Sequence, residues 1–197
     1  MAALVCLGAG AASPDDLVES DPSPETPDTA RIVLERVIDG QAIARSGGKL
    51  VRWITGSTPN RALERPYGIA WDGDDLIVTD PGAGRVIRIS RKNKVKTSPA
   101  AVFDTPIGVA VCPSGIVVTD ARLGRVTLLD HKLRRVRDLA DGLERPTGVA
   151  CAESRVYVIE TGAHRILALD PSRHSDPGID LAWGRRGSGP GEFNFPA

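Results

Sequence analysis

The sequence predicts an all-β fold built from repeated four-stranded antiparallel sheets, the blades of an incomplete β-propeller. The first observation is a period: Pro66, Pro106 and Pro146 recur 40 residues apart, and other positions keep the same register. The second is that each copy contains short apolar runs separated by turn residues. The third is that the apolar spacing of an amphipathic helix is absent. The positions in register are Gly68, Gly108 and Gly148; Asp80, Asp120 and Glu160; Arg85, Arg125 and Arg165; and Ser90, Asp130 and Asp170.

Each copy is expected to supply four strands, the arithmetic of a propeller blade. The first apolar run of each copy follows the proline and contains a glycine, where neighbouring backbones come close. The second and third runs are rich in β-branched residues. The expected first strands are 67–71, 107–111 and 147–151, the second 76–79, 116–119 and 156–159, and the third 85–89, 125–129 and 165–169. The weaker fourth strands are expected at 101–103, 137–139 and 179–183.

Composition excludes several other classes of protein. The chain has 197 residues, of which 41% are hydrophobic and 25% charged, far from the balance of a disordered chain. No run of 18 apolar residues is present to span a membrane. Three cysteines do not make a disulfide scaffold or a CxxC zinc knuckle.

The first 30 residues differ from the rest of the chain. Residues 1–12 are small and apolar and predict the remnant of a signal peptide, although the usual basic start is missing. Cys6 is an alternative lipid attachment site, but the bulky Val5 fits that pattern poorly. Residues 13–30 are acidic and proline-rich and predict a disordered tether. We therefore expect residues 31–197 to form an exported domain in the periplasm or at the cell surface.

The repeated pattern resembles the NHL repeat, in which Pro-x-Gly-Val-Ala is followed by Val-x-Asp-x-Gly-x-x-Arg-Val. The segment 184–196 resembles the lead into a new NHL blade, and 163–166 resembles the family's Asn-His-Arg-Ile with Ala163 in place of Asn. The chain departs from the family where Glu160 replaces Asp and where Gly84 and Gly124 replace the histidine. The resemblance implies a β-propeller that closes with six blades.

Against that expectation, the chain holds about three to four blades. Three are recognisable, and the runs 31–38 and 50–54 suggest part of another. Pro196 takes the blade-opening position, with Ala197 alone after it. We expect a truncated copy of a longer protein; the alternative is a native partial propeller that self-associates through its open blade faces.

An acid and an arginine flank the same turn in every copy. Because they recur in all three copies, a structural ion pair that ties the turn is favoured over a catalytic role. The predicted pairs are Asp80–Arg85, Asp120–Arg125 and Glu160–Arg165.

The histidines carry no metal-binding motif. His131, His164 and His174 form no HxH, HxxxH or HExxH pair, so no cofactor and no metal ligand are predicted. The alternative is a metal-dependent enzyme resembling the peptidyl-amidating lyases or lactonases, with Zn or Ca in a central channel formed partly by missing blades. His164 is the residue to examine for that alternative.

The two later cysteines stand one step out of register. Cys112 lies six residues after its proline and Cys151 five, which places them on opposite strand faces. We predict that they do not pair and that each is a small core residue.

Two basic clusters, 91–96 and 132–137, occupy equivalent hairpins. Their expected role is to protect sheet edges and keep the blades soluble. The alternative is an anion-binding rim for an acidic polysaccharide, a lipid headgroup or RNA, but no aromatic residues are interleaved for stacking, so a nucleic acid is not favoured.

The functional prediction is a non-enzymatic binding or scaffold module of the cell envelope. Its turn-rich face presents loops to a protein or another envelope component. Tyr67, Arg122 and His164 are the predicted binding residues, because they are expected to be exposed on turns and are not repeated.

Overall fold

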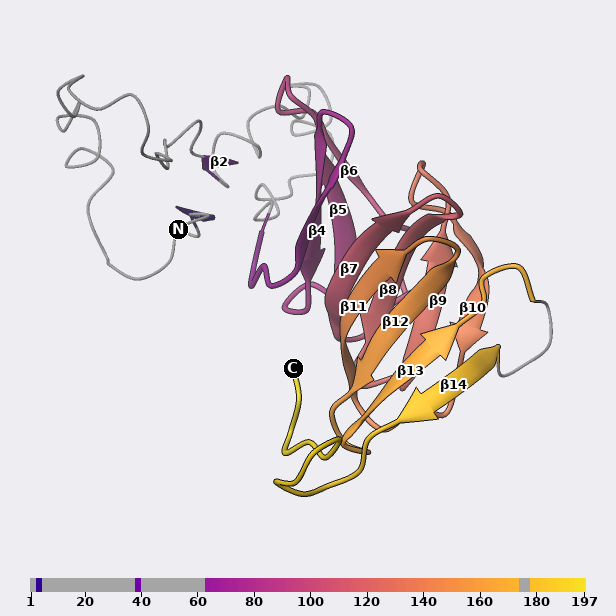
Figure 1. The fold of residues 1–197 in the computed structure, drawn as a ribbon. Helices are drawn as coiled ribbons and strands as arrows, with labels where there is room; N and C mark the ends of the chain where they lie inside the picture. Colours follow the sequence, from indigo (N-terminus) through magenta and orange to yellow (C-terminus); the bar gives the residue numbers. More distant parts are fainter. Residues whose placement is uncertain (1–2, 5–37, 40–62, 174–177) are drawn as a thin grey trace, which may run out of the picture.

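The computed structural model describes residues 3–4, 38–39, 63–173 and 178–197. Within these residues it shows three four-stranded antiparallel sheets and one short two-stranded pair (Figure 1). No helix in the described part of the chain is long and apolar enough to cross a membrane. The predicted disordered tether, Cys6, His174 and most of the partial first blade lie outside the described residues.

Each sheet is a meander whose strands follow the order of the sequence. The first sheet contains β3 (Ile69–Asp72), β4 (Asp75–Asp80), β5 (Arg85–Ile89) and β6 (Val95–Thr97). The second contains β7 (Pro106–Cys112), β8 (Gly115–Asp120), β9 (Arg125–Leu129) and β10 (Arg135–Ala140). The third contains β11 (Pro146–Ala152), β12 (Arg155–Glu160), β13 (Arg165–Leu169) and β14 (Ile179–Trp183). The short pair joins β1 (Ala3–Leu4) to β2 (Ile38–Asp39).

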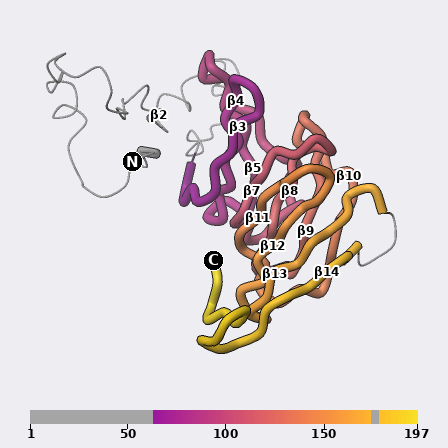
Figure 2. Tube along the Cα trace, in the orientation of Figure 1, coloured from indigo at the N-terminus to yellow at the C-terminus, as the bar shows by residue number. Residues whose placement is uncertain are grey.

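The three sheets stack face to face, with the first strands β3, β7 and β11 next to one another. The tube in Figure 2 shows the chain finishing one sheet before it enters the next. This is the arrangement of propeller blades, so the predicted all-β partial propeller is confirmed with three described blades.

Both faces of the middle blade are buried because side chains alternate along each strand. Ile116 and Val118 of β8 point to the first blade, where they pack with Ile77, whereas Val117 points to the third blade and packs with Val158. Apolar residues on both faces of β8 therefore explain its continuous β-branched run.

The fourth strand of the first blade was predicted at 101–103, and this is wrong. The hairpin after β5 closes at once, because the amide of Ser90 donates to the carbonyl of Lys94 at 2.9 Å. The next strand must then begin at Val95, and its polar sequence is tolerated at the outer edge of the sheet. Residues 101–103 instead form the linker to the second blade, and Phe103 packs into the core between blades.

The prediction that Cys112 and Cys151 remain unpaired is also wrong. The structure joins them in a disulfide, with their Cα atoms 5.7 Å apart, within the range such bonds span. A one-residue offset places two side chains on opposite faces of a strand, and within one sheet this would keep the cysteines apart. Stacked blades, however, meet through opposite faces of their equivalent strands. A one-residue offset is therefore what brings the two side chains together, and the bond links the second blade to the third.

The turns and linkers gather at one end of the blades and the hairpins at the other. We call the first the turn end, consisting of residues 63–67, 81–84, 103–105, 121–124, 143–145, 161–164 and 184–197. We call the second the hairpin end, consisting of residues 72–75, 90–94, 113–114, 130–134, 153–154 and 170–173. The turn end is the lower end in Figure 1.

Glycines in the first strands allow the blades to approach. A Cβ on Gly108 would collide with the carbonyl oxygen of Thr147 in the next blade and would lie 2.8 Å from Thr119 Oγ1. Gly108→Ala is expected to lower the free energy of unfolding by about 3 kcal/mol, since the blades cannot separate without losing core contacts.

Urea denaturation measures this loss. The control is Gly142→Ala, where a Cβ meets nothing within 4 Å and only the positive φ of 69° is strained. That control should cost about 1 kcal/mol. Equal losses in the two variants would contradict tight packing of the blades at Gly108.

Candidate functional site

The turn end is held together by three buried acids, Asp80, Asp120 and Glu160. Each ends the second strand of its blade and accepts hydrogen bonds from the linker that enters the same blade. Asp80 accepts from the amides of Glu64 and Arg65, both at 2.8 Å. These bonds fix the linker against the turn that follows the acid.

Asp120 makes the most extensive of these connections. Its carboxylate accepts from the linker amides of Asp104 at 2.7 Å and Thr105 at 3.1 Å. It also accepts from the turn amides of Arg122 at 3.1 Å and Leu123 at 3.0 Å. One buried carboxylate therefore organises both the linker and the turn. In the third blade, Glu160 accepts from the amide of Glu144 at 2.7 Å.

The predicted acid–arginine pairs are only partly present. Arg165 Nε lies 2.5 Å from Glu160, whereas Arg85 approaches Asp80 only to 4.0 Å. The Asp120–Arg125 pair is not formed: Arg125 lies 3.6 Å from Asp138 and donates to the carbonyl of Val102. Asp120 is already occupied by backbone amides, which explains why its arginine turns elsewhere.

Two threonines connect neighbouring blades, a role that the sequence did not predict. Thr79 Oγ1 accepts from the amide of Gly68 and donates to the carbonyl of Ile107 in the next blade, both at 2.7 Å. Thr119 makes the same bridge from Gly108 to Thr147. The repeated threonine in the 40-residue register was the signal that could have found it.

Tyr67 and Arg122 lie on the turn end and point to solvent. Tyr67 is 66% exposed, and the Arg122 side chain is 76% exposed with its guanidinium 3.6 Å from Asp104. Sequence reasoning missed Leu123 and Phe195, which are also exposed at this end. The turn end thus presents aromatic and arginine side chains on a hydrogen-bonded frame.

His164, the third predicted binding residue, is not exposed. Only 7% of its surface is accessible, and its ring lies 4.5 Å from that of Phe195. The amide of Phe195 donates to His164 Nδ1 at 3.1 Å, and Thr161 Oγ1 donates to the carbonyl of Pro196 at 2.7 Å. His164 therefore fastens the C-terminal segment onto the third blade.

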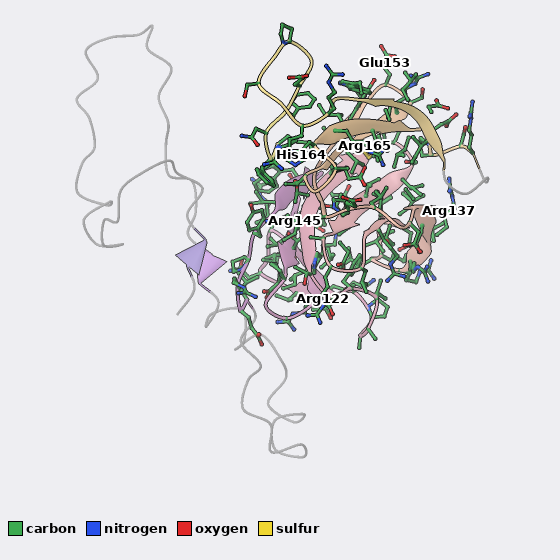
Figure 3. The ribbon with its side chains drawn as sticks, turned by 90° about the horizontal axis from the view of Figure 1, so that it is seen from below. Arg122, Arg137, Arg145, Glu153, His164 and Arg165 are labelled. Carbon is green, nitrogen blue, oxygen red and sulfur yellow. A yellow bond between two sulfur atoms is a disulfide. The ribbon has the colours of Figure 1, made fainter. Side chains whose placement is uncertain are left out.

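The view from below in Figure 3 places Arg122, Arg145 and His164 toward the inner strands of the arc and Arg137 on its outer side. Arg186 lies 5.7 Å from the centre of the Phe195 ring. Arg122 and Arg145 thus lie on the side of the arc where the first strands of the blades meet (Figure 3).

The hairpin end contains a polar cluster that joins the first two blades. Arg88 donates to Asp72 and Asp75, both at 2.7 Å, and to the carbonyl of His131 at 2.6 Å. His131 Nδ1 lies 2.9 Å from Asp72. Burial opposes ionisation of Asp72, but its bonds to His131 and Arg88 outweigh it and lower its pKa.

A lowered pKa for Asp72 gives stability a definite pH dependence. The folded state favours the ionised carboxyl, so its contribution is present above the unfolded pKa of about 3.8 and is lost as pH falls through the lower folded pKa. We expect the acid unfolding curve of Asp72→Asn to be flatter than that of the unmodified chain below about pH 4. Circular dichroism against pH measures the difference, and parallel curves would contradict the role given to Asp72.

A cavity of about 310 Å³ lies at the hairpin end between the second and third blades. In the 40-residue register, Leu128 stands where the first blade has Arg88, and Cys112 stands where it has Asp72. The charged groups that connect the first two blades are thus replaced here by smaller or apolar ones. The cavity is lined by Cys112, Pro113, Ser114, Glu153, Ser154, Arg155, Val156, Asp170, Pro171 and Ser172.

Within the described ranges, no group of three His, Cys, Asp or Glu side chains is placed to hold a metal ion. The candidate His164 already uses Nδ1 as an acceptor for the Phe195 amide. The polar side chains of the turn end are instead arranged to bind backbone and to meet solvent.

Comparison with known proteins supports the fold. No protein-family model matches the sequence. No curated protein matches it either. Among solved structures, the chain is similar to virginiamycin B lyase from Staphylococcus aureus, with 15% identity and a TM-score of 0.50, over 59% of this chain and 41% of the lyase. It is also similar to a chain of the nidogen/laminin complex, with 19% identity and a TM-score of 0.53, over 61% of this chain and 47% of that one.

The chain therefore spans less than half the length of each of these two structures. At these identities the similarity establishes the fold alone. The conclusion of the comparisons is that the described residues form part of a β-propeller.

Proposed function

We propose that this chain is a non-enzymatic binding module of the NHL-repeat type, exported to the cell envelope, that recognises a protein partner through its turn end. The observation that carries the proposal is the exposure of Tyr67 and Arg122 at that end, at 66% and 76%. Tyrosine and arginine are the residue types that dominate binding energy at protein interfaces. Phe195, 58% exposed, adds a third anchor.

Rigidity of the turn end supports the same proposal. The buried carboxylates of Asp80 and Asp120 hold the linkers, so the exposed side chains are presented on an ordered frame. A surface ordered before binding loses less conformational entropy when the partner docks.

Export has separate support from the Cys112–Cys151 disulfide. Disulfides persist in oxidising compartments such as the periplasm and the cell surface and are rare in the cytosol. The apolar residues 1–12 agree with that location. The NHL assignment is supported by the repeated motif together with the propeller fold.

In the test, an envelope protein is first captured with the unmodified chain and purified. The dissociation constants of two double variants for that protein are then compared. Tyr67→Ser with Arg122→Ser removes the two anchors and is expected to raise the dissociation constant at least about tenfold. The control is Val136→Ser with Arg134→Ser, which removes one exposed apolar residue and one exposed, singly paired arginine from the outer edge and hairpin end.

An equal loss in both double variants, or a loss in the control alone, would show that the turn end is not the binding surface. Both variants change exposed side chains, so near-native circular dichroism is expected for each. The measurement therefore reports binding and not folding.

The enzyme alternative is compatible with the fold, because virginiamycin B lyase has a similar fold, but that similarity does not extend to its activity. The alternative would require a metal centre completed by residues beyond those described. A metal that copurifies in stoichiometric amount and is lost in His164→Ala would support it. Metal retained in that variant would exclude His164 as a ligand.

Self-association is the third candidate function, and the outer face of the third blade favours it. Leu181 and Trp183 are 54% and 41% exposed there, and Trp183 contacts Tyr157 edge to face. In the middle blade, the equivalent face is covered by a neighbouring sheet. Light scattering on the purified chain, compared with Trp183→Glu, distinguishes self-association from a monomeric module.

A further inference from the structure

We propose that the hairpin end is a second binding surface, and that its ligand is an acidic polysaccharide. The surface consists of the tip 130–134 and, in the adjacent blade, the tip 90–96, which is the hairpin 90–94 together with the first two residues of β6. It lies at the opposite end of the blades from the surface proposed for a protein partner.

The lysines of the described chain all lie on these two tips. The sequence has five lysines, and the four within the described residues are Lys92, Lys94, Lys96 and Lys132. All four are exposed. None has an acidic partner within 4.0 Å among the described residues, so their charges are available to a ligand.

The acids of the same region are already neutralised by arginines. Arg88 binds Asp72 and Asp75, both at 2.7 Å. Asp74 lies 3.8 Å from Arg91, and Asp130 lies 2.7 Å from Arg134. The region thus contains three arginines and four lysines against four aspartates, which gives it a net charge of +3.

The two tips are held in fixed positions. The carbonyl of His131, on the second tip, accepts from Arg88 of the first blade at 2.6 Å. Leu133 on the same tip is fully buried in the core between these blades. The first tip is closed by Ser90, whose carbonyl accepts from Asn93 and whose amide donates to Lys94. The lysines therefore project from an ordered edge that spans two blades.

The chemistry of these residues favours a linear polyanion with repeated carboxylate or sulfate groups. The ammonium group of lysine is a hydrated point charge without a fixed bonding geometry. The planar guanidinium of arginine, in contrast, binds phosphate through two parallel hydrogen bonds. The nearby arginines are already used by acids. A single-stranded nucleic acid would need aromatic rings for stacking, and the exposed aromatic residues Tyr67, Trp71, Trp183 and Phe195 all lie outside the tips.

The test uses the full chain with heparin and polygalacturonate as probes. The tip variant carries Lys92→Ser, Lys94→Ser, Lys96→Ser and Lys132→Ser. The matched control carries Arg65→Ser, Arg122→Ser, Arg145→Ser and Arg186→Ser, which removes the same charge from exposed positions at the turn end. Circular dichroism confirms that each variant is folded.

The expected result is that the tip variant binds both probes at least about tenfold more weakly and loses most of the salt dependence of binding, while the control keeps both. Equal weakening in the two variants would show a response to net charge alone and would overturn the proposal. Absence of binding by the unmodified chain would also overturn it. Tighter binding of an RNA homopolymer or of anionic lipid vesicles than of either polysaccharide would overturn the assignment of the ligand.

Discussion

Asp120→Ala is expected to lower the free energy of unfolding by about 3–5 kcal/mol, because it leaves several backbone amides without an acceptor. Asp120 is fully buried and accepts from the linker amides of Asp104 and Thr105 and from the turn amides of Arg122 and Leu123. Hydrogen bonds to a buried carboxylate are stronger than those between neutral groups. Chemical denaturation followed by circular dichroism measures the change.

Asp130→Ala is the matched control. Asp130 also accepts from two backbone amides, those of Lys132 and Arg134, but it does so on an exposed hairpin where water replaces the lost acceptor. We expect a much smaller change for it. A loss in Asp120→Ala no larger than in Asp130→Ala would mean that the carboxylate does not organise the turn end.

Removal of the disulfide is expected to lower the free energy of unfolding by about 4 kcal/mol, as loop-closure entropy estimates for a loop of this length. The bond links residues 39 apart in sequence and in adjacent blades. The variant Cys112→Ala with Cys151→Ala should unfold at a lower denaturant concentration than the oxidised chain.

The reduced form of the unmodified chain provides the control. Because reduction breaks the same link without changing the sequence, reduced protein and double variant should unfold at similar concentrations. A midpoint that does not respond to reduction would show that the second and third blades are held together without the bond.

Much of the fold could be predicted because its signals are local and repeated. The β-branched runs predicted β4, β8 and β12 to within one residue, since buried strands need such side chains on both faces. The fourth strand of the first blade was missed because an edge strand such as Val95–Thr97 needs no apolar pattern. Local pattern thus predicts the inner strands better than the outer ones.

The connections between elements were harder to predict. The repeated acid at Asp120 was recognised, but its partners are backbone amides, which leave no mark in the sequence. The disulfide was missed because its geometry depends on how two sheets stack. His164 was predicted to be exposed, yet the segment carrying Phe195 folds over it. In each case the missing information was a contact between elements distant in the chain.

Hydrogen exchange of the chain, alone and with a purified envelope partner, tests the central claim that the turn end binds a protein. We predict that the partner slows exchange at 63–67, 120–124 and 184–197, because Tyr67, Arg122 and Phe195 lie there. The hairpin tips 90–96 and 130–134 should exchange at unchanged rates. Slower exchange confined to the tips, or to β14 on the outer face of the third blade, would contradict the claim.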